Sequence, residues 1–88
     1  MSDALDGNML AGALSELLTF DITSATGKCA SCGAVGVMAQ ARVFATAPGL
    51  TARCATCGQV LLRLVRSPDR AWLDLHGLSF LQVALPPP

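Results

Sequence analysis

The order of hydrophobic and polar residues predicts a helix followed by several short strands. Leucines recur at helical spacing near the start of the chain, at positions 10, 14, 17 and 18, and Asp6 stands where an N-cap is expected. We therefore predict an amphipathic N-terminal helix over residues 1–20. Such a stripe is typical both of a helix that covers a sheet of its own chain and of one that binds a partner or dimerises.

Further along, the pattern changes to the alternation of β-strands. Residues 37–46 alternate so that Ala41 and Val43 share one face and Arg42 and Phe44 share the other. This alternation predicts a strand with two different faces.

Pro48-Gly49 suits the centre of a turn after this strand. With these two residues as the whole loop, Thr46 faces Thr51 and Phe44 faces Arg53. Two-residue hairpins prefer other turn types, so a longer loop that shifts this register stays open.

A second hairpin is predicted from residues 60–66 and 71–76, with Pro68-Asp69 at the turn. With that turn, residues of opposite charge lie across from each other on one face of the hairpin, and leucines lie across from each other on the other face. Both faces therefore favour the same register. The predicted pairs are Arg63 with Asp74 and Val65 with Trp72, and Leu62 with Leu75 and Leu64 with Leu73.

The 88 residues are enough for a single domain. We predict a small α+β chain, mostly β, with the helix in residues 1–20 and antiparallel hairpins in residues 21–85. Residues 77–85 suit either a short helix or a last edge strand. Residues 86–88 are three prolines and are expected to form a frayed tail.

The most specific pattern is a pair of Cys-x-x-Cys-Gly segments that contain every cysteine of the chain: Cys29, Cys32, Cys54 and Cys57. Two such segments can place four sulfurs around one tetrahedral metal ion, as in structural zinc sites. The sequence therefore predicts one structural Zn²⁺ held by a four-cysteine zinc ribbon.

The residues around the cysteines support this interpretation. Gly33 and Gly58 can take a positive φ and bring an N–H close to a sulfur. Lys28 and Arg53 precede the two segments and favour thiolates. The two segments, residues 28–33 and 53–58, are similar in sequence, which suggests two similar loops that bind one ion.

Other uses of four cysteines are less well supported. Iron suits a tetrahedron of four sulfurs as well as zinc does. Two disulfides need an oxidising compartment, and thioredoxin-like chemistry uses one Cys-x-x-Cys rather than two. Because four cysteines leave no open coordination position, we expect no catalytic metal and no enzyme.

Composition and charge bear on possible partners. The formal net charge is zero, 52% of residues are hydrophobic and 14% are charged. This hydrophobic share is high for so small a chain, so we expect another chain to cover part of its surface. The composition therefore indicates a protein partner or a homo-oligomer. Four thiolates with Zn²⁺ add about −2 to the charge, which disfavours general affinity for phosphate backbones. A nucleic-acid interface built from the arginines stays as an alternative: Arg53, Arg63, Arg66 and Arg70.

Few other features suggest chemistry. His76 is the only histidine and has no nucleophile or orienting group at a recognisable spacing. Trp72 suits either stacking on a partner or packing within a strand pair. No small-molecule site, membrane span or basic leader is evident, so the default expectation is a cytoplasmic protein.

The doubled Cys-x-x-Cys-Gly on hairpins resembles rubredoxin-like zinc ribbons. The whole chain resembles a family of short, uncharacterised actinobacterial zinc-ribbon proteins, over residues 4–82. The resemblance implies a ribbon fold and a metal but no activity. Ala30 and Ala55 stand where rubredoxins carry a proline, which disfavours an iron electron carrier. The resembling segments are residues 5–8, 21–23 and 71–75 and the two cysteine segments.

Overall fold

A computed structural model describes residues 5–15, 17–18, 20–46 and 49–85, and every structural statement below concerns these residues. The protein is mostly β, with two antiparallel sheets and little helix, which confirms the predicted mostly-β class. None of the described helices is long or apolar enough to cross a membrane. The elements are β1 (Leu5–Asp6), α1 (Met9–Leu14), the 3-10 turn η1 (Ile22–Ser24), β2 (Thr26–Cys29), β3 (Val35–Val37), the 3-10 turn η2 (Met38–Gln40), β4 (Arg42–Thr46), β5 (Gly49–Arg53), β6 (Val60–Arg66), β7 (Ala71–Asp74) and β8 (Leu78–Gln82).

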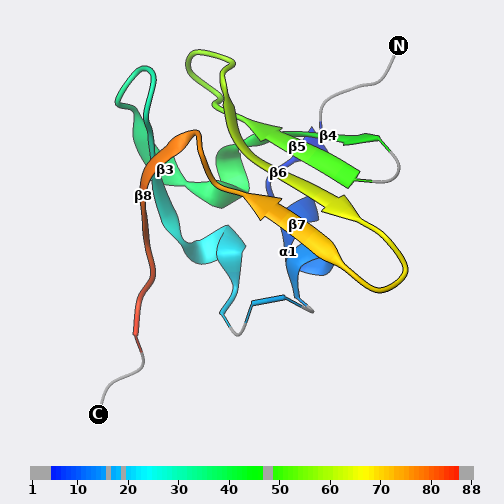
Figure 1. Ribbon diagram of the computed structural model, residues 1–88. Coiled ribbons are helices and arrows are strands. Elements are labelled where there is room, and N and C mark those ends of the chain that lie inside the picture. Colours follow the sequence, from blue (N-terminus) through cyan, green and yellow to red (C-terminus); the bar gives the residue numbers. More distant parts are fainter. Residues whose placement is uncertain (1–4, 16, 19, 47–48, 86–88) are drawn as a thin grey trace.

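The strands form two sheets that lie side by side (Figure 1). We call the five-stranded sheet, in the order β1-β4-β5-β6-β7, sheet A, and the three-stranded sheet, in the order β3-β2-β8, sheet B. The first cysteine pair belongs to sheet B, because Cys29 ends β2 and Cys32 lies in the loop between β2 and β3. The loop between β5 and β6 belongs to sheet A and carries the second pair.

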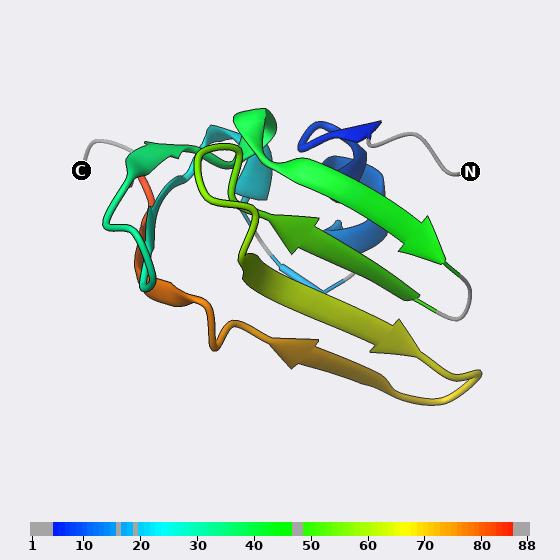
Figure 2. The same ribbon diagram turned by 90° about the horizontal axis from the view of Figure 1, so that it is seen from above.

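The core lies between the inner face of sheet A, α1 and sheet B. Figure 2 shows α1 on one side of sheet A. Leu10 and Leu14 of α1 are 0% and 1% exposed, and they join Val43, Leu62 and Leu64 of the sheet in one cluster. Burying such side chains is the main favourable contribution to folding.

The helix is much shorter than the predicted span of residues 1–20. Leu5 and Asp6 pair with β4 as a strand, and the N-cap is Asn8 rather than the predicted Asp6. The Asp6 carboxylate accepts a hydrogen bond from the Asn8 amide at 3.0 Å. The Gly7 amide donates to the Ala39 carbonyl at 2.9 Å, which holds the chain against η2 before the helix starts. Pairing with β4 thus holds Leu5 and Asp6 in a strand, before the leucine stripe that begins at Leu10. The predicted residues 1–4, 16 and 19 lie outside the described residues.

The predicted register between β4 and β5 is wrong by two residues. Thr46 faces Gly49, and Phe44 faces Thr51. Gly49 is part of β5 rather than the turn. A glycine is needed there because a Cβ would lie 1.9 Å from the Leu64 carbonyl oxygen of the neighbouring strand. The glycine therefore permits close strand packing. Residues 47–48, which connect the strands, lie outside the described residues.

The register of the second hairpin is confirmed, but β7 ends at Asp74, so the predicted pair of Leu62 with Leu75 is not part of the ladder. Arg63 pairs with Asp74, Leu64 with Leu73, and Val65 with Trp72. The segment for which a helix and an edge strand were both open is a strand, β8, and it pairs with β2 of sheet B.

Gly77 joins the two sheets where the chain passes from β7 to β8. Its amide donates to the Leu61 carbonyl of sheet A at 3.1 Å, and its carbonyl accepts from the Ala30 amide of the first cysteine loop at 2.9 Å. A Cβ here would lie 1.7 Å from the Val60 carbonyl oxygen, so only glycine fits.

Candidate metal centre

The structure brings the four cysteines together at the junction of the two sheets. All four Sγ atoms lie within 4.8 Å of one another. Cys29 Sγ lies 3.7 Å from Cys57 Sγ, and Cys32 Sγ lies 3.7 Å from Cys54 Sγ. A disulfide needs a sulfur separation of about 2.05 Å, so these are four free thiols.

The spacing suits a tetrahedral metal ion. With metal–sulfur bonds of about 2.3 Å, the sulfurs of a tetrahedron lie about 3.8 Å apart. Both short contacts join one cysteine of each loop, and Cys29 and Cys54 are buried while Cys32 and Cys57 are exposed. An ion bound here would therefore be held by both sheets.

The two loops have the same backbone hydrogen bonds. In the first, the Cys29 amide donates to the Ala34 carbonyl at 2.9 Å and the Gly33 amide donates to the Cys29 carbonyl at 2.9 Å. In the second loop, the Cys54 amide donates to the Gln59 carbonyl at 2.8 Å and the Gly58 amide to the Cys54 carbonyl at 2.9 Å. We call these loops, residues 29–34 and 54–59, knuckle 1 and knuckle 2. The two segments that are similar in sequence therefore also have the same backbone hydrogen bonds.

Each knuckle closes through a glycine in the left-handed region. Gly33 has φ 78° and Gly58 has φ 80°, and no other described residue has a positive φ. Side chains other than hydrogen are strained there. The positive φ of both glycines confirms the prediction. The predicted approach of their amides to sulfur is wrong, because these amides donate to the carbonyls of Cys29 and Cys54.

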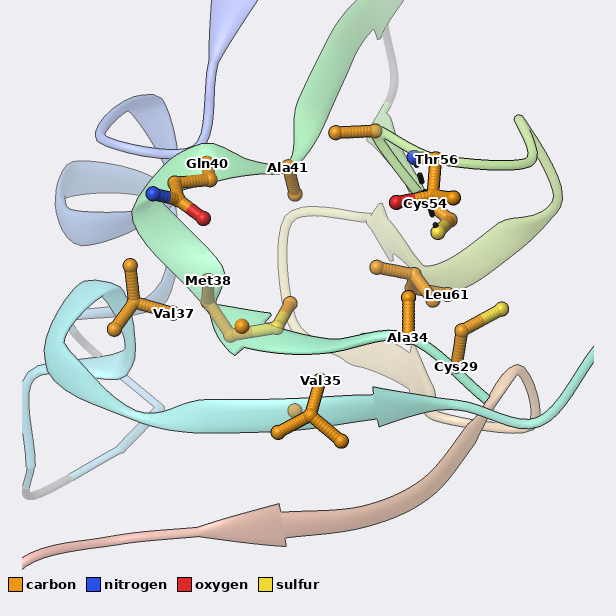
Figure 3. A pocket seen from close by; sticks show the side chains of 13 residues that line it. Cys29, Ala34, Val35, Val37, Met38, Gln40, Ala41, Cys54, Thr56 and Leu61 are labelled. Carbon is orange, nitrogen blue, oxygen red and sulfur yellow. Dashed lines mark hydrogen bonds between the residues drawn. The ribbon is translucent and has the colours of Figure 1, made fainter. Parts of the chain in front are cut away.

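Backbone amides stabilise negative charge on the buried sulfurs. The Thr56 amide lies 3.4 Å from Cys54 Sγ, and Figure 3 shows this contact. The Cys32 amide is the largest of the influences that lower the pKa of Cys29. Burial raises the pKa of Cys54, but the amides of Cys57 and Thr56 and the neighbouring sulfurs outweigh it and lower that pKa to about 6.

Deprotonation of the fourth cysteine, Cys32, is unfavourable without a cation. The Ala34 amide lowers the pKa of Cys32, but burial and the three neighbouring thiols outweigh it and raise that pKa to about 11. Four thiolates so close together repel one another, and a divalent cation removes that repulsion. The donor set thus fits a sulfur-binding metal ion.

Arg53 supports knuckle 2 from outside. Its Nη1 donates to the Gly58 carbonyl at 2.9 Å, and its guanidinium carbon lies 6.0 Å from the centroid of the Phe44 ring. This places a fixed cation beside the second cysteine pair.

A cavity of about 80 Å³ lies next to the cysteines, between β3, η2 and knuckle 2 (Figure 3). Its walls are mainly aliphatic, and of the described residues that line it only Cys29 and Cys54 titrate. His76 does not line this cavity. It is exposed after β7, where its amide donates to the Asp74 carboxylate at 2.8 Å. No histidine therefore lies beside the cysteines in the lining of this cavity.

The arginines are arranged differently from the predicted strip at positions 53–70. Arg42 of β4 lies directly opposite Arg53 of β5, and Arg63 lies on the same face of sheet A. Sequence reasoning placed Arg42 on the right face of its strand but paired Arg53 with Phe44. The two-residue register error thus hid this arginine pair.

Comparison with known proteins gives one match. A model of the Family of unknown function (DUF6510) matches residues 1–86. No curated protein and no solved structure gives a significant match.

Proposed function

The chain belongs to the DUF6510 family of unknown function, and we propose that it is a non-catalytic zinc-ribbon module that binds another protein chain or a second copy of itself. One structural Zn²⁺ is held by Cys29, Cys32, Cys54 and Cys57. The observation that carries the proposal is the cluster of four Sγ atoms within 4.8 Å, contributed by loops of two different sheets. A cytoplasmic location belongs to the proposal, because reducing conditions keep the thiols available.

Zinc suits this donor set better than the alternatives. Thiolates in a closed tetrahedron are typical of structural zinc, and four protein ligands leave no position for a substrate or water. Iron binds the same donors, so metal analysis is part of the test. The absence of an open coordination position supports a structural rather than a catalytic role.

The ion acts as a cross-link between the two sheets. The core of an 88-residue chain is small, and such domains usually need an additional staple. A structural zinc supplies about 10–16 kcal/mol of apparent binding free energy at neutral pH. Since the ligands come from both knuckles, this free energy stabilises the arrangement of one sheet against the other.

The outer face of sheet B is the candidate protein-binding surface. Val35 and Phe80 lie on either side of Lys28 in one cross-strand row, and Val37 lies in the next row. The exposed fractions of Val35, Val37 and Phe80 are 58%, 40% and 44%. Exposed hydrophobic side chains gathered on one face favour association with another chain.

Native mass spectrometry of the protein purified from its own cells tests the metal and the stoichiometry together. We expect one zinc ion per chain, a colourless sample, and a dimer or a complex with another protein. Iron in place of zinc contradicts the metal assignment. A clean monomer at high concentration in light scattering, with no bound chain in the native spectrum, contradicts the binding role.

Matched variants locate the surface. Val35→Asp places a charge on the outer face of sheet B and is expected to weaken association. Leu85→Asp makes the same kind of change at a residue that is 84% exposed and lies after β8, so it is expected to leave association unchanged. Equal effects of the two variants would show that another surface is used.

A further inference from the structure

The outer face of sheet A, turned away from α1, carries three arginines, the exposed Trp72 and the half-buried Phe44. Alternation along the strands places Arg42 and Phe44 of β4, Arg53 of β5, Arg63 of β6 and Trp72 of β7 on this side. Figure 2 shows no described element covering this side of the sheet. We call these five residues the arginine face.

The three arginines lie on neighbouring central strands. Arg42 and Arg53 are directly opposite each other, and Arg63 faces Thr51 in the next row. Like charges opposite each other across a strand pair are destabilising unless an anion lies between them. The sheet thus maintains a positive strip that favours a negatively charged ligand.

Among the described residues, the acidic groups on this face lie at the edge strands of the sheet. Asp6 of β1 faces Arg42, and Asp74 of β7 faces Arg63. Both carboxylates accept backbone hydrogen bonds in their own loops, from the Asn8 amide at 3.0 Å and the His76 amide at 2.8 Å. Each carboxylate faces one arginine, so this side of the sheet carries three positive charges against two negative ones. Of the three arginines, Arg53 is the one with no acidic residue paired opposite it in the described strands.

Two aromatic rings accompany the arginines. Trp72 is 55% exposed although it stands within a strand, and it lies next to Val65 across the strand pair. Phe44 is half-buried and its ring lies 6.0 Å below the guanidinium carbon of Arg53. An exposed ring on a flat sheet is a platform on which a planar base can stack.

We propose that the arginine face binds single-stranded nucleic acid, with phosphates at Arg42, Arg53 and Arg63 and a base stacked on the exposed ring of Trp72. Arginines interleaved with aromatic side chains on an open sheet are the features that recognise single strands, whose bases are accessible. A duplex hides its bases and would leave the indole without a partner. This inference goes beyond the proposed function and does not depend on what sheet B binds.

The charge of the whole molecule limits the affinity. The formal net charge is zero, and the metal with four thiolates adds about −2. Attraction therefore comes from the face alone and falls quickly with salt. Three phosphate contacts predict a slope of about −2 for the logarithm of the binding constant against the logarithm of salt concentration.

The experiment uses the zinc-loaded protein and a fluorescein-labelled oligothymidylate at low ionic strength. Because Trp72 is the only tryptophan, quenching of its intrinsic fluorescence reports binding at this face, while anisotropy of the label reports binding anywhere. We expect both signals to give the same Kd, and we expect that Kd to rise with salt.

Three variants test the assignment. Trp72→Ala is expected to raise Kd at least about fivefold, which is the loss of one stacked base. Arg42→Gln combined with Arg63→Gln is expected to reduce the salt slope from about −2 to about −0.7. Arg70→Gln removes the same charge at the β6–β7 turn and is expected to leave the slope unchanged. Arg53 is left intact because it contacts knuckle 2.

Each remaining outcome overturns the proposal. No change in anisotropy at low ionic strength shows that the face binds no single strand. Binding without quenching, or an equal effect of Arg70→Gln, places the nucleic acid elsewhere. A polyglutamate peptide that competes as well as the oligothymidylate shows that the face selects negative charge alone, as a docking site for an acidic protein segment would. Metal analysis of every sample separates these outcomes from loss of zinc.

Discussion

The Sγ atoms of Cys29 and Cys57 lie 3.7 Å apart although 28 positions separate the two residues in the chain. The contact between Cys32 and Cys54 has the same length and also joins the two knuckles. Because knuckle 1 belongs to sheet B and knuckle 2 to sheet A, a metal ion bound by all four cysteines would fix the position of one sheet relative to the other. Substitutions at the cysteine ligands, at the knuckle glycines and at Gly77 between the sheets measure separate parts of this arrangement.

Loss of one sulfur should remove most of the stability that the metal provides. Cys54→Ser replaces a buried ligand with a hydroxyl, which binds zinc poorly. We expect this variant to lose zinc and to melt at the temperature of the chelator-treated wild type. Thermal unfolding followed by circular dichroism, with zinc content measured on the same sample, checks this.

Thr56→Ala is the matched control for this ligand variant. It changes a residue within knuckle 2 but retains the backbone amide that contacts Cys54 Sγ. We expect it to keep one zinc ion per chain and the wild-type response to chelator. If wild-type protein melts at the same temperature with and without chelator, the metal is not structural.

Zinc affinity should fall as pH falls, in two stages. Near pH 7 the raised pKa of Cys32, about 11, keeps a proton on that thiol, and zinc must displace it. Below the lowered pKa of Cys54, about 6, zinc must displace a further proton. The pH dependence of the affinity therefore steepens below about 6.

Competition between the protein and a chromophoric chelator over a pH series measures this slope. Calorimetry in buffers of different ionisation enthalpy counts the protons released. Affinity that rises on acidification would contradict thiolate ligation.

The knuckle glycines should resist substitution for conformational rather than steric reasons. Gly58 has φ 80°, yet a Cβ at this position would contact nothing within 4 Å. Gly58→Ala should therefore lower the free energy of unfolding by about 1–3 kcal/mol, the cost of a left-handed non-glycine residue. Gly58→Asn should cost less, because asparagine tolerates this conformation.

Gly12 of α1 provides the control for the knuckle glycines. It has equally open surroundings and lies in a helix. Gly12→Ala should raise the free energy of unfolding by up to about 1 kcal/mol, because alanine is the better helix former. Urea unfolding of the zinc-loaded variants gives both values; equal effects at the two positions would exclude a conformational cause at Gly58.

The correct and incorrect parts of the fold prediction have a common physical origin. The β6–β7 register was predictable because charge pairing between Arg63 and Asp74 and the leucine face between Leu64 and Leu73 demand the same alignment. At the β4–β5 hairpin one turn signal decided the alignment. Gly49 was interpreted as a turn residue, whereas the approach of the Leu64 carbonyl oxygen is what requires glycine there. A close contact with a distant strand leaves no local signal.

The site was predictable to a similar extent. Spacing and the two glycines were sufficient to group the four cysteines, because a knuckle is a local structure repeated twice. The arginine face was not predictable from the sequence. It depends on the register between Arg42 and Arg53 and on which side of sheet A is covered by α1. Leu17, part of the predicted helical stripe, is 40% exposed because α1 ends at Leu14. Properties that arise from the pairing of distant segments therefore required the structure.

Gly77, where the chain passes between the sheets, should tolerate substitution poorly, as should Gly7, where a Cβ would also lie 1.7 Å from a backbone carbonyl oxygen. A side chain here would place its Cβ 1.7 Å from the Val60 carbonyl oxygen and 2.7 Å from Leu61 Cα, both in the backbone of β6. Backbone cannot move aside as a flexible side chain can. Gly77→Ala must therefore separate β6 from the segment that leads to β8, and it breaks the hydrogen bond from the Gly77 amide to the Leu61 carbonyl.

Because Gly77 also accepts the hydrogen bond from the Ala30 amide in knuckle 1, we expect this variant to weaken zinc binding as well as folding. The free energy of unfolding should fall by more than about 2 kcal/mol, beyond the ordinary cost of a point substitution. Urea unfolding and zinc competition on the same preparation measure the two effects. A variant that is destabilised but binds zinc with wild-type affinity would show that knuckle 1 is positioned without Gly77.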